Sequence, residues 1–234
     1  KHGGALVTIR VTLQASYSAP GFPTEQEDMP AEAPATVVDS SGLAVTSLAL
    51  VDPSSMMGAA ELGDDFQYEI KVTDAKMLLG DGKEIPVRLA LRDEDLDLAV
   101  FEPEQVPTEP LEFVDLSAAG PADTLDSVVL LSRLGRIGNR AAGAAVARVN
   151  AVLSKPRLFY VLAQGQEFLG APAFTLKGEP LGIVTLRWID IPAAEAMGQS
   201  FGMNPGLIVV RPGADVLEVV KQAREEKAEP PAAP

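Results

Sequence analysis

Short apolar segments separated by glycine and proline dominate this chain of 234 residues. It contains 20 glycines and 19 prolines, a larger share than in an average globular protein. Both residues mark turns and proline ends helices, so long uninterrupted helices have little room to form. Several segments between them are rich in β-branched residues that alternate with polar ones, which is typical of strands. The pattern predicts an all-β protein and argues against a helical bundle.

The expected strands fall into two groups on either side of a proline-rich stretch at 103–110, which indicates an interdomain linker. In the first group they lie at 5–13, 36–46 (a hairpin), 66–73, 75–79, 85–92 and 98–102. In the second group they lie at 127–132, 144–153, 157–163, 172–176, 181–187 and 206–210. Many short strands without alternating helices favour antiparallel barrels or sandwiches.

We therefore expect an N-terminal barrel over residues 1–105 and a second barrel over 106–212. A helix at 213–227 should pack on the second barrel, and 228–234 should form a disordered tail. Asp215 is the expected N-cap of the helical pattern, which is regular over 216–227. Residues 19–35 carry four prolines and four acidic side chains and are expected to form a solvated loop.

Charge and the absence of cysteine exclude several classes of function. The 33 acidic and 19 basic side chains give a formal net charge of −14, which opposes nucleic acid and anionic lipid as partners. Without cysteine the chain can form neither disulfides nor zinc–thiolate sites, and it has no thiol nucleophile. No apolar run approaches the about 18 residues of a membrane span. The single histidine is His2, and no metal or cofactor is expected.

Three segments, in order along the chain, resemble motifs of one protease family. Residues 42–51 (GLAVTSLALV) are similar to G-x-x-V-T-N-x-H-V-V, and 93–101 (DEDLDLAVF) to D-x-x-T-D-L-A-V-L. Residues 167–185 (EFLGAPAFTLKGEPLGIVT) are similar to G-N-S-G-G-P-L-x-N-x-x-G-x-V-I-G-I-x-T. These motifs belong to the HtrA/Deg-type, trypsin-like serine proteases, whose fold is a double β-barrel with a C-terminal helix.

The resemblance puts Ala49 at the histidine position, Asp97 at the aspartate position and Leu169 at the serine position. We call these three the triad-equivalent positions. Ala49 and Leu169 can neither accept a proton nor attack a carbonyl, so the resemblance implies a degenerate, inactive protease domain. The oxyanion-hole positions correspond to Glu167 and Leu169, and a carboxylate at Glu167 would repel a developing oxyanion. A side chain there would also restrict backbone angles that glycine allows.

Other residues are open to a functional and a structural interpretation. Asp97 is either a relic of the triad or a carboxylate held by backbone amides, and we favour the second interpretation, with a raised pKa unless other donors replace the imidazole. The acidic run at 93–97 could suggest calcium, but it lacks the glycine and closing glutamate of a recognised loop. Thr175 and Thr185 are expected to be strand residues rather than nucleophiles.

A cluster of cations, Arg133, Arg136 and Arg140, stands out in an acidic chain and is a candidate for binding a carboxylate, a phosphate or an acidic partner. The alternative is an exposed loop that pairs with the protein's own acids. Phe168, beside the serine position, is a further candidate binding residue.

The expected function is a protein- or peptide-binding scaffold module, because an extended peptide can add to a sheet edge without being cleaved. The alternatives are an active serine-type endopeptidase with a non-standard catalytic arrangement and a purely structural domain. By resemblance alone, the expected location is periplasmic or extracytoplasmic.

Overall fold

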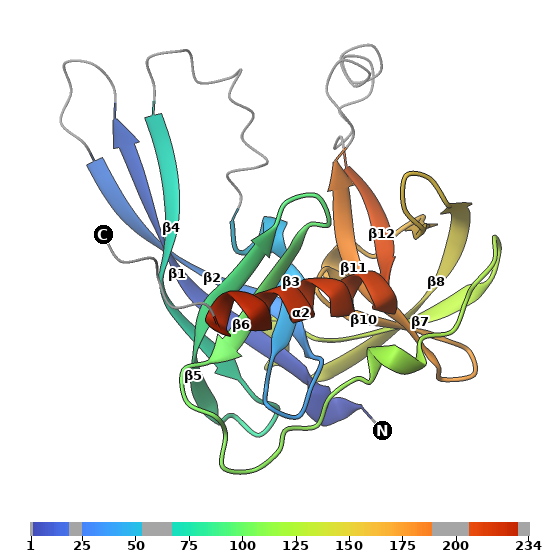
Figure 1. Cartoon of the computed structure of the whole chain (residues 1–234), viewed down its shortest axis with the longest axis horizontal. Helices are drawn as coiled ribbons and strands as arrows, with labels where there is room; N and C mark the ends of the chain where they lie inside the picture. The colour runs from blue at the N-terminus through green and yellow to red at the C-terminus, as the bar shows by residue number, and fades with distance from the viewer. Residues whose placement is uncertain (1, 19–24, 53–66, 189–205, 229–234) are drawn as a thin grey trace.

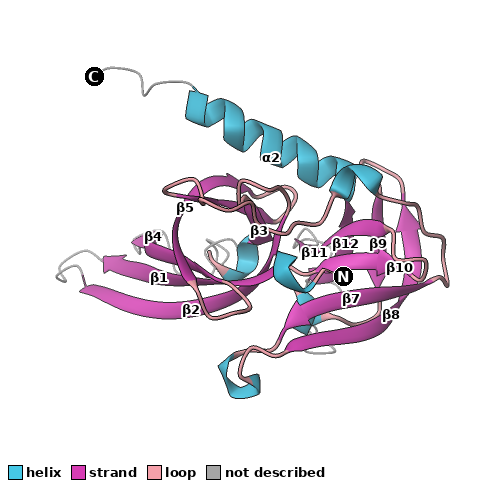
Figure 2. Cartoon of the chain, turned by 90° about the horizontal axis from the view of Figure 1, so that it is seen from below, coloured by secondary structure: helices cyan, strands magenta, loops and turns pink. Residues whose placement is uncertain are grey.

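The structure, a computed structural model, describes residues 2–18, 25–52, 67–188 and 206–228. These residues form two closed β-barrels and one α-helix that lies across both of them (Figures 1 and 2). The predicted all-β architecture of two antiparallel barrels and a C-terminal helix is therefore confirmed.

The first barrel is closed in the order β1-β2-β3-β6-β5-β4. Its strands are β1 (Leu6–Ser18), β2 (Glu25–Val37), β3 (Ala44–Ser47), β4 (Gln67–Leu78), β5 (Glu84–Asp93) and β6 (Leu98–Pro103). Alternate side chains point inward, so that Val7, Ile9 and Val11 of β1 are buried in the barrel core. The strands expected at 66–73 and 75–79 are one strand, β4, whose pairing with β1 contains a register shift.

Strand β2 corrects the sequence analysis over residues 25–35, which belong to the expected solvated loop at 19–35; the first part of that loop, 19–24, lies outside the described residues. β2 pairs with β1 along nearly its whole length. Its inward side chains include the buried Ala33 and Ala35, small residues that the barrel interior accommodates at close strand spacing. The other edge of β2 pairs with β3 only at its last two residues. Pro30 and Pro34 therefore remove no ladder hydrogen bond on that edge, which is where a strand tolerates proline.

Residues 104–126 lead to the second barrel and contain a 3₁₀ turn, η4 (Leu116–Ala118). The second barrel is closed in the order β10-β11-β12-β9-β8-β7. Its strands are β7 (Ser127–Arg133), β8 (Ala142–Leu153), β9 (Phe159–Leu162), β10 (Pro172–Thr175), β11 (Pro180–Trp188) and β12 (Gly206–Pro212). Each of the six strands predicted for this barrel overlaps one of these strands.

The helix α2 (Gly213–Ala228) starts earlier than the regular pattern indicated, so that Asp215 lies in its first turn rather than at the N-cap. We expected it on the second barrel, and it contacts β11 and β12 there, but it also contacts β5 and β6 of the first barrel. Its buried face joins one apolar cluster with both barrels, through Leu98 of β6 and Ile183 of β11. Figure 2 shows the helix lying over the two barrels. Within the described residues, no helix is both long and apolar enough to cross a bilayer.

Candidate functional site

Ala49 is the middle residue of a 3₁₀ turn, η2 (Leu48–Leu50), that follows strand β3. Strand β3 pairs with β6 in a register that sets Ser47 opposite Leu98, so Asp97, one residue earlier, lies beside this turn. The N–H of Ala49 donates a hydrogen bond to Oδ1 of Asp97 at 2.9 Å. Two of the three triad-equivalent positions are thus in direct contact.

Leu169 follows a second 3₁₀ turn, η6 (Gln166–Phe168), and precedes strand β10. Its side chain is 3% exposed and that of Ala49 is 7% exposed. Both belong to one cluster of packed apolar side chains that is otherwise built mainly from the second barrel. The side chains at these two positions, a methyl and an isobutyl group, are therefore both buried in apolar surroundings, and neither can attack a carbonyl or transfer a proton.

Asp97 is a buried carboxylate that accepts hydrogen bonds from both barrels. Its Oδ2 accepts from the hydroxyl of Ser47 at 2.5 Å and from the N–H of Leu186, on β11, at 2.7 Å. With the bond from Ala49, three donors surround a side chain that is 3% exposed. Its φ of 55° lies in the left-handed region, which a non-glycine residue adopts at some cost. The carboxylate therefore acts as a fixed link between the barrels.

Burial raises the pKa of Asp97 above its ordinary value. The hydrogen bonds from Ser47, Leu186 and Ala49 and the positive charge of Arg211 act in the opposite direction, but they do not outweigh the loss of hydration. Other donors thus take the place of the imidazole, and the pKa of Asp97 is nevertheless raised. The hydrogen bonds give Asp97 a structural role, while its burial makes the charged form of the carboxylate less favourable than in water.

The loop before Leu169 directs its backbone donors inward. The N–H of Phe168 donates to the carbonyl of Gly165 at 2.8 Å, and the N–H of Leu169 donates to that of Gln166 at 3.4 Å. Of the two expected oxyanion-hole positions, Glu167 and Leu169, only Leu169 is one of these donors, and an oxyanion hole requires its N–H to point at the substrate oxygen. Gly165, with a φ of 128°, provides the unusual backbone angle of this loop. Glu167 is exposed on the turn, and Phe168 is buried.

Gly170 packs this loop directly against the first barrel. Its carbonyl accepts a hydrogen bond from the hydroxyl of Thr36 at 2.9 Å. Its φ is 81°, and a Cβ at this position would overlap the carbonyl oxygen of Pro34 and the hydroxyl of Thr46. Only glycine fits both the backbone angle and the close approach of the two barrels.

The three candidate arginines do not form one open cationic patch. Arg133 donates to the carbonyls of Leu6 at 2.6 Å, Gly3 at 2.8 Å and Arg140 at 3.2 Å, and so fastens the start of the chain to the second barrel. Arg140 forms an ion pair with Glu32 at 2.6 Å. Arg136 is exposed on its own 3₁₀ turn. Two of the three side chains are therefore engaged within the molecule.

The acidic run at 93–97 has local structural partners. Oδ1 of Asp93 accepts the N–H of Leu96 at 2.8 Å and closes the turn before β6, while Asp97 has the contacts described above. Within the described parts of the chain, no three His, Cys, Asp or Glu side chains are grouped so that they could hold a metal ion.

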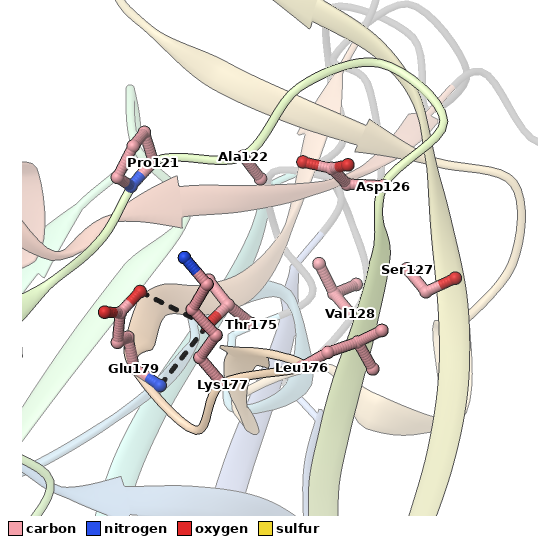
Figure 3. Close-up of a pocket in the computed structure, with 9 residues that line it drawn as sticks. All are labelled: Pro121, Ala122, Asp126, Ser127, Val128, Thr175, Leu176, Lys177 and Glu179. Carbon is pink, nitrogen blue, oxygen red and sulfur yellow. Dashed lines mark hydrogen bonds between the residues drawn. The ribbon is translucent and has the colours of Figure 1, made fainter.

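One cavity lies on the second barrel, away from the triad-equivalent positions. It measures about 210 Å³, and its lining is drawn in Figure 3: Pro121, Ala122, Asp126, Ser127, Val128, Thr175, Leu176, Lys177 and Glu179. Thr175 and Glu179 close its lower side through the hydrogen bond from the N–H of Glu179 to Oγ1 of Thr175 at 3.3 Å. The hydroxyl of Thr175 lies 3.5 Å from Oε2 of Glu179, beyond the about 2.6–3.2 Å of an activated nucleophile and base, and none of the triad-equivalent positions lines the cavity, so its geometry points to no reaction.

A second cavity, of about 460 Å³, adjoins the site, because its lining includes Leu186, whose N–H is bonded to Asp97. Three arginines also line it: Arg157, Arg187 and Arg211. The sequence analysis did not single out these residues, since they lie in three separate elements. The one local signal is a cation, Arg211, at the end of the apolar strand β12.

The two six-stranded barrels and the C-terminal helix are the fold of trypsin-like serine protease domains. The MamO protease domain from Magnetospirillum magneticum, in its apo form, matches 93% of this chain and 96% of its own, with a TM-score of 0.56 and 13% identity. A serine-to-alanine variant of the HtrA-type protease AlgW with a decapeptide matches 95% of this chain, with a TM-score of 0.63 and 16% identity. This chain spans 64% of that AlgW chain.

Identities this low establish a shared fold and nothing about activity. Neither a protein-family model nor a curated protein sequence matches the chain.

Proposed function

We propose that this chain is a catalytically inactive trypsin-like domain that binds an extended peptide or protein segment beside its former reaction centre. The observation that carries the proposal is that Ala49 and Leu169, at the motif positions of base and nucleophile, are both buried in one apolar cluster, with the N–H of Ala49 bonded to Asp97. Acyl transfer on this fold needs an imidazole and a hydroxyl in that space. Without them a bound peptide has no partner for its scissile carbonyl.

The backbone of the loop supports the same proposal. The N–H of Leu169, one of the two expected oxyanion-hole positions, donates to the carbonyl of Gln166 within the turn η6. Loss of a single oxyanion donor costs about 10²–10³ in rate, so a replacement nucleophile elsewhere would still lack this stabilisation. The exposed carboxylate of Glu167 adds negative charge at the same place.

Binding of a peptide is supported by the fold and by one solved neighbour. The AlgW structure combines this fold, a serine-to-alanine substitution and a decapeptide, so in that protein the peptide is present without the serine. In the present chain, strand β11 pairs with β10 only up to Ile183 but with β12 up to Trp188, so its last residues have one edge without a strand partner among the described residues. A peptide in extended form can be recognised by main-chain hydrogen bonds to such a strand without any chemistry.

The proposal is tested by separating cleavage from binding. The purified chain is incubated with fluorescent casein and with an active-site phosphonate probe, and its affinity for decapeptides from a random library is measured by fluorescence anisotropy. We expect neither cleavage nor labelling, and saturable peptide binding in the micromolar range. Glu167→Lys, beside Leu169, should change the affinity, whereas Glu109→Lys, exposed on the linker, should leave it unaltered.

Casein hydrolysis that is abolished by one substitution in the chain would identify an active endopeptidase with a non-standard arrangement and would end the proposal. We also propose an extracytoplasmic location for the domain, on the basis of the sequence motifs alone. Fractionation of the producing cells tests it, and recovery in the cytoplasmic fraction alone would contradict it.

A further inference from the structure

The cavity of about 460 Å³ next to Asp97 combines three arginines with two acidic residues. It is bounded by the turn at 94–96, by the chain entering β9, and by strands β11 and β12. Its lining consists of Glu94, Asp95, Leu96, Pro156, Arg157, Leu186, Arg187 and Arg211. Counting the ionised side chains, the lining has one more positive than negative charge, in a molecule with a net charge of −14.

Arg211 is the deepest cation of this cavity and is 1% exposed. Its Nε donates to the carbonyl of Leu96 at 3.2 Å, and its Nη2 donates to the carbonyl of Asp95 at 3.3 Å. Its Nη1 is buried and has no hydrogen-bond partner among the described residues. Buried guanidinium donors are normally satisfied, so an unpaired one points to a partner outside the described chain.

The neighbouring charges do not compensate for the burial of Arg211. Asp215, Asp97 and Asp93 favour its charged form, yet burial and the nearby cation Arg187 lower its pKa below the ordinary value. The nearby acidic side chains do not fully balance the buried positive charge of Arg211. An anion that enters the cavity would therefore be attracted to this charge.

Arg187 and Arg211 are held in place by the same aromatic ring. The guanidinium of Arg187 lies 4.7 Å from the centroid of Phe159, and that of Arg211 lies 5.5 Å from it. Such stacking fixes the plane of a guanidinium while its N–H groups stay available. Arg157, by contrast, has only a 3.5 Å ion pair with Glu218, both side chains being about half exposed, so it is easily redirected.

We infer that this cavity binds a carboxylate group carried by the peptide ligand proposed above, with Arg187 and Arg157 donating to it and Arg211 supplying the fixed charge beneath. The inference rests on the proposed function, because it assigns the ligand class of that site. Planar guanidinium groups match a carboxylate through paired N–H donors. A phosphate dianion fits less well, since Glu94 and Asp95 line the same cavity and would repel its second charge.

The first experiment titrates small probes into the ¹⁵N-labelled chain and follows the backbone amides of Leu96, Leu186 and Arg187 by NMR. N-acetylglutamate α-amide represents an acidic side chain, and N-acetylalanine represents a chain end. N-acetylglutamine α-amide and N-acetylalanine amide are the matched neutral controls, and inorganic phosphate is the third arm. We expect saturable shifts with one or both carboxylates only. Equal shifts with the neutral amides, no shifts at all, or tighter binding of phosphate would overturn the inference.

The second experiment uses Arg187→Met, which retains an apolar contact with Phe159, and Arg148→Met, which removes an exposed charge from β8 outside this cavity. We expect carboxylate binding to weaken about tenfold in Arg187→Met and to stay unchanged in Arg148→Met. Arg157→Met repeats the test if the first variant does not fold. Unchanged affinity in a folded Arg187→Met or Arg157→Met variant contradicts the assignment.

Peptide binding distinguishes the two proposals. If acidic peptides and their amidated counterparts bind equally well, the carboxylate site is wrong and the binding function stands. If no peptide binds, the proposed function fails, and the small-molecule titration still decides whether the cavity takes a carboxylate.

Discussion

The backbone N–H of Leu186, in the second barrel, donates a 2.7 Å hydrogen bond to Oδ2 of Asp97, in the first barrel. The same oxygen also accepts from Ser47, and the whole carboxylate is buried. In an active trypsin-like enzyme the equivalent carboxylate orients an imidazole. Here the side chain instead joins two strands that come from different barrels.

Asp97→Asn should destabilise the fold. An amide nitrogen at the position of Oδ2 can donate to Ser47 but cannot accept from Leu186, so one buried N–H loses its partner. The expected loss is about 1–3 kcal/mol in the free energy of unfolding, measured by urea denaturation. Glu109→Gln removes one exposed carboxylate and is the matched control, expected within about 0.5 kcal/mol of the parent. Equal stability of the two variants would contradict the role of Asp97 as a link.

Stability should depend on pH through Asp97. Its pKa is raised in the folded state, so the folded chain binds the proton more tightly than the unfolded chain does. The stabilising contribution is complete below about pH 4, the ordinary value for aspartate, and is lost as the pH rises through the folded pKa. The stability difference between the parent and Asp97→Asn should therefore narrow as the pH rises from about 4 to 7. Urea denaturation of both proteins across this range tests the sign, and a widening difference would show that the folded pKa is lowered.

Gly170→Ala should be far more harmful than a chemically identical change at Gly178. Both glycines have left-handed backbone angles, with φ of 81° and 82°. A Cβ at Gly170 overlaps atoms of Pro34 and Thr46, whereas one at Gly178 has no described atom within 4 Å. We expect about 1 kcal/mol for Gly178→Ala from the backbone angle alone and at least about 3 kcal/mol for Gly170→Ala. Thermal denaturation compares the two variants. Similar losses of stability would show that the loop at Gly170 does not pack closely against the first barrel.

Restoring the two missing side chains should not restore an efficient protease. In Ala49→His/Leu169→Ser the N–H at position 169 still donates to the carbonyl of Gln166, so the transition state lacks one of its two oxyanion donors. We expect no casein cleavage above the background of the parent chain. Adding Glu167→Gly and Phe168→Asn, which restores the loop sequence of the motif, should raise the rate by about 10²-fold if the donors turn outward. Strong activity of the double variant alone would show that the loop reorganises freely.

Arg133 should be structural rather than part of a binding surface. Arg133→Met loses three hydrogen bonds to backbone carbonyls and leaves those of Gly3 and Leu6 without this partner. We expect a loss of about 1–3 kcal/mol on denaturation. Arg136→Met, on the exposed turn, should cost no more than about 0.5 kcal/mol. If both changes leave the free energy of unfolding unchanged, Arg133 is not structural, and the arginine cluster is again a candidate binding surface.

The sequence allowed most of the fold to be predicted, because β-branched runs between glycine and proline turns have the period of strands. Strand β2 escaped detection because Ala33 and Ala35 are weakly apolar and Pro30 and Pro34 are typical of loops. Its existence depends on pairing with β1, which a local pattern does not contain. The helix start was set too late, since the packing of Gly213 against η4 determines it rather than a capping residue.

The candidate site was predictable where it depends on motif and order, and not where it depends on tertiary contacts. The resemblance of three motifs suggested that Ala49, Asp97 and Leu169 belong together, and the structure brings the N–H of Ala49 to the carboxylate of Asp97. The donors around Asp97 come from both barrels and depend on how the barrels meet, whereas the hydrogen bond of the Leu169 N–H depends on the local fold of the turn η6. The arginine cavity is likewise assembled from residues that are far apart in the chain.

The helix α2 rests on both barrels although it is encoded after both of them. During synthesis each barrel can close on its own strands as these emerge from the ribosome. Their mutual seating is completed only when the helix is also outside the exit tunnel. A partner that contacts residues of both barrels should therefore bind only after the helix has packed on them.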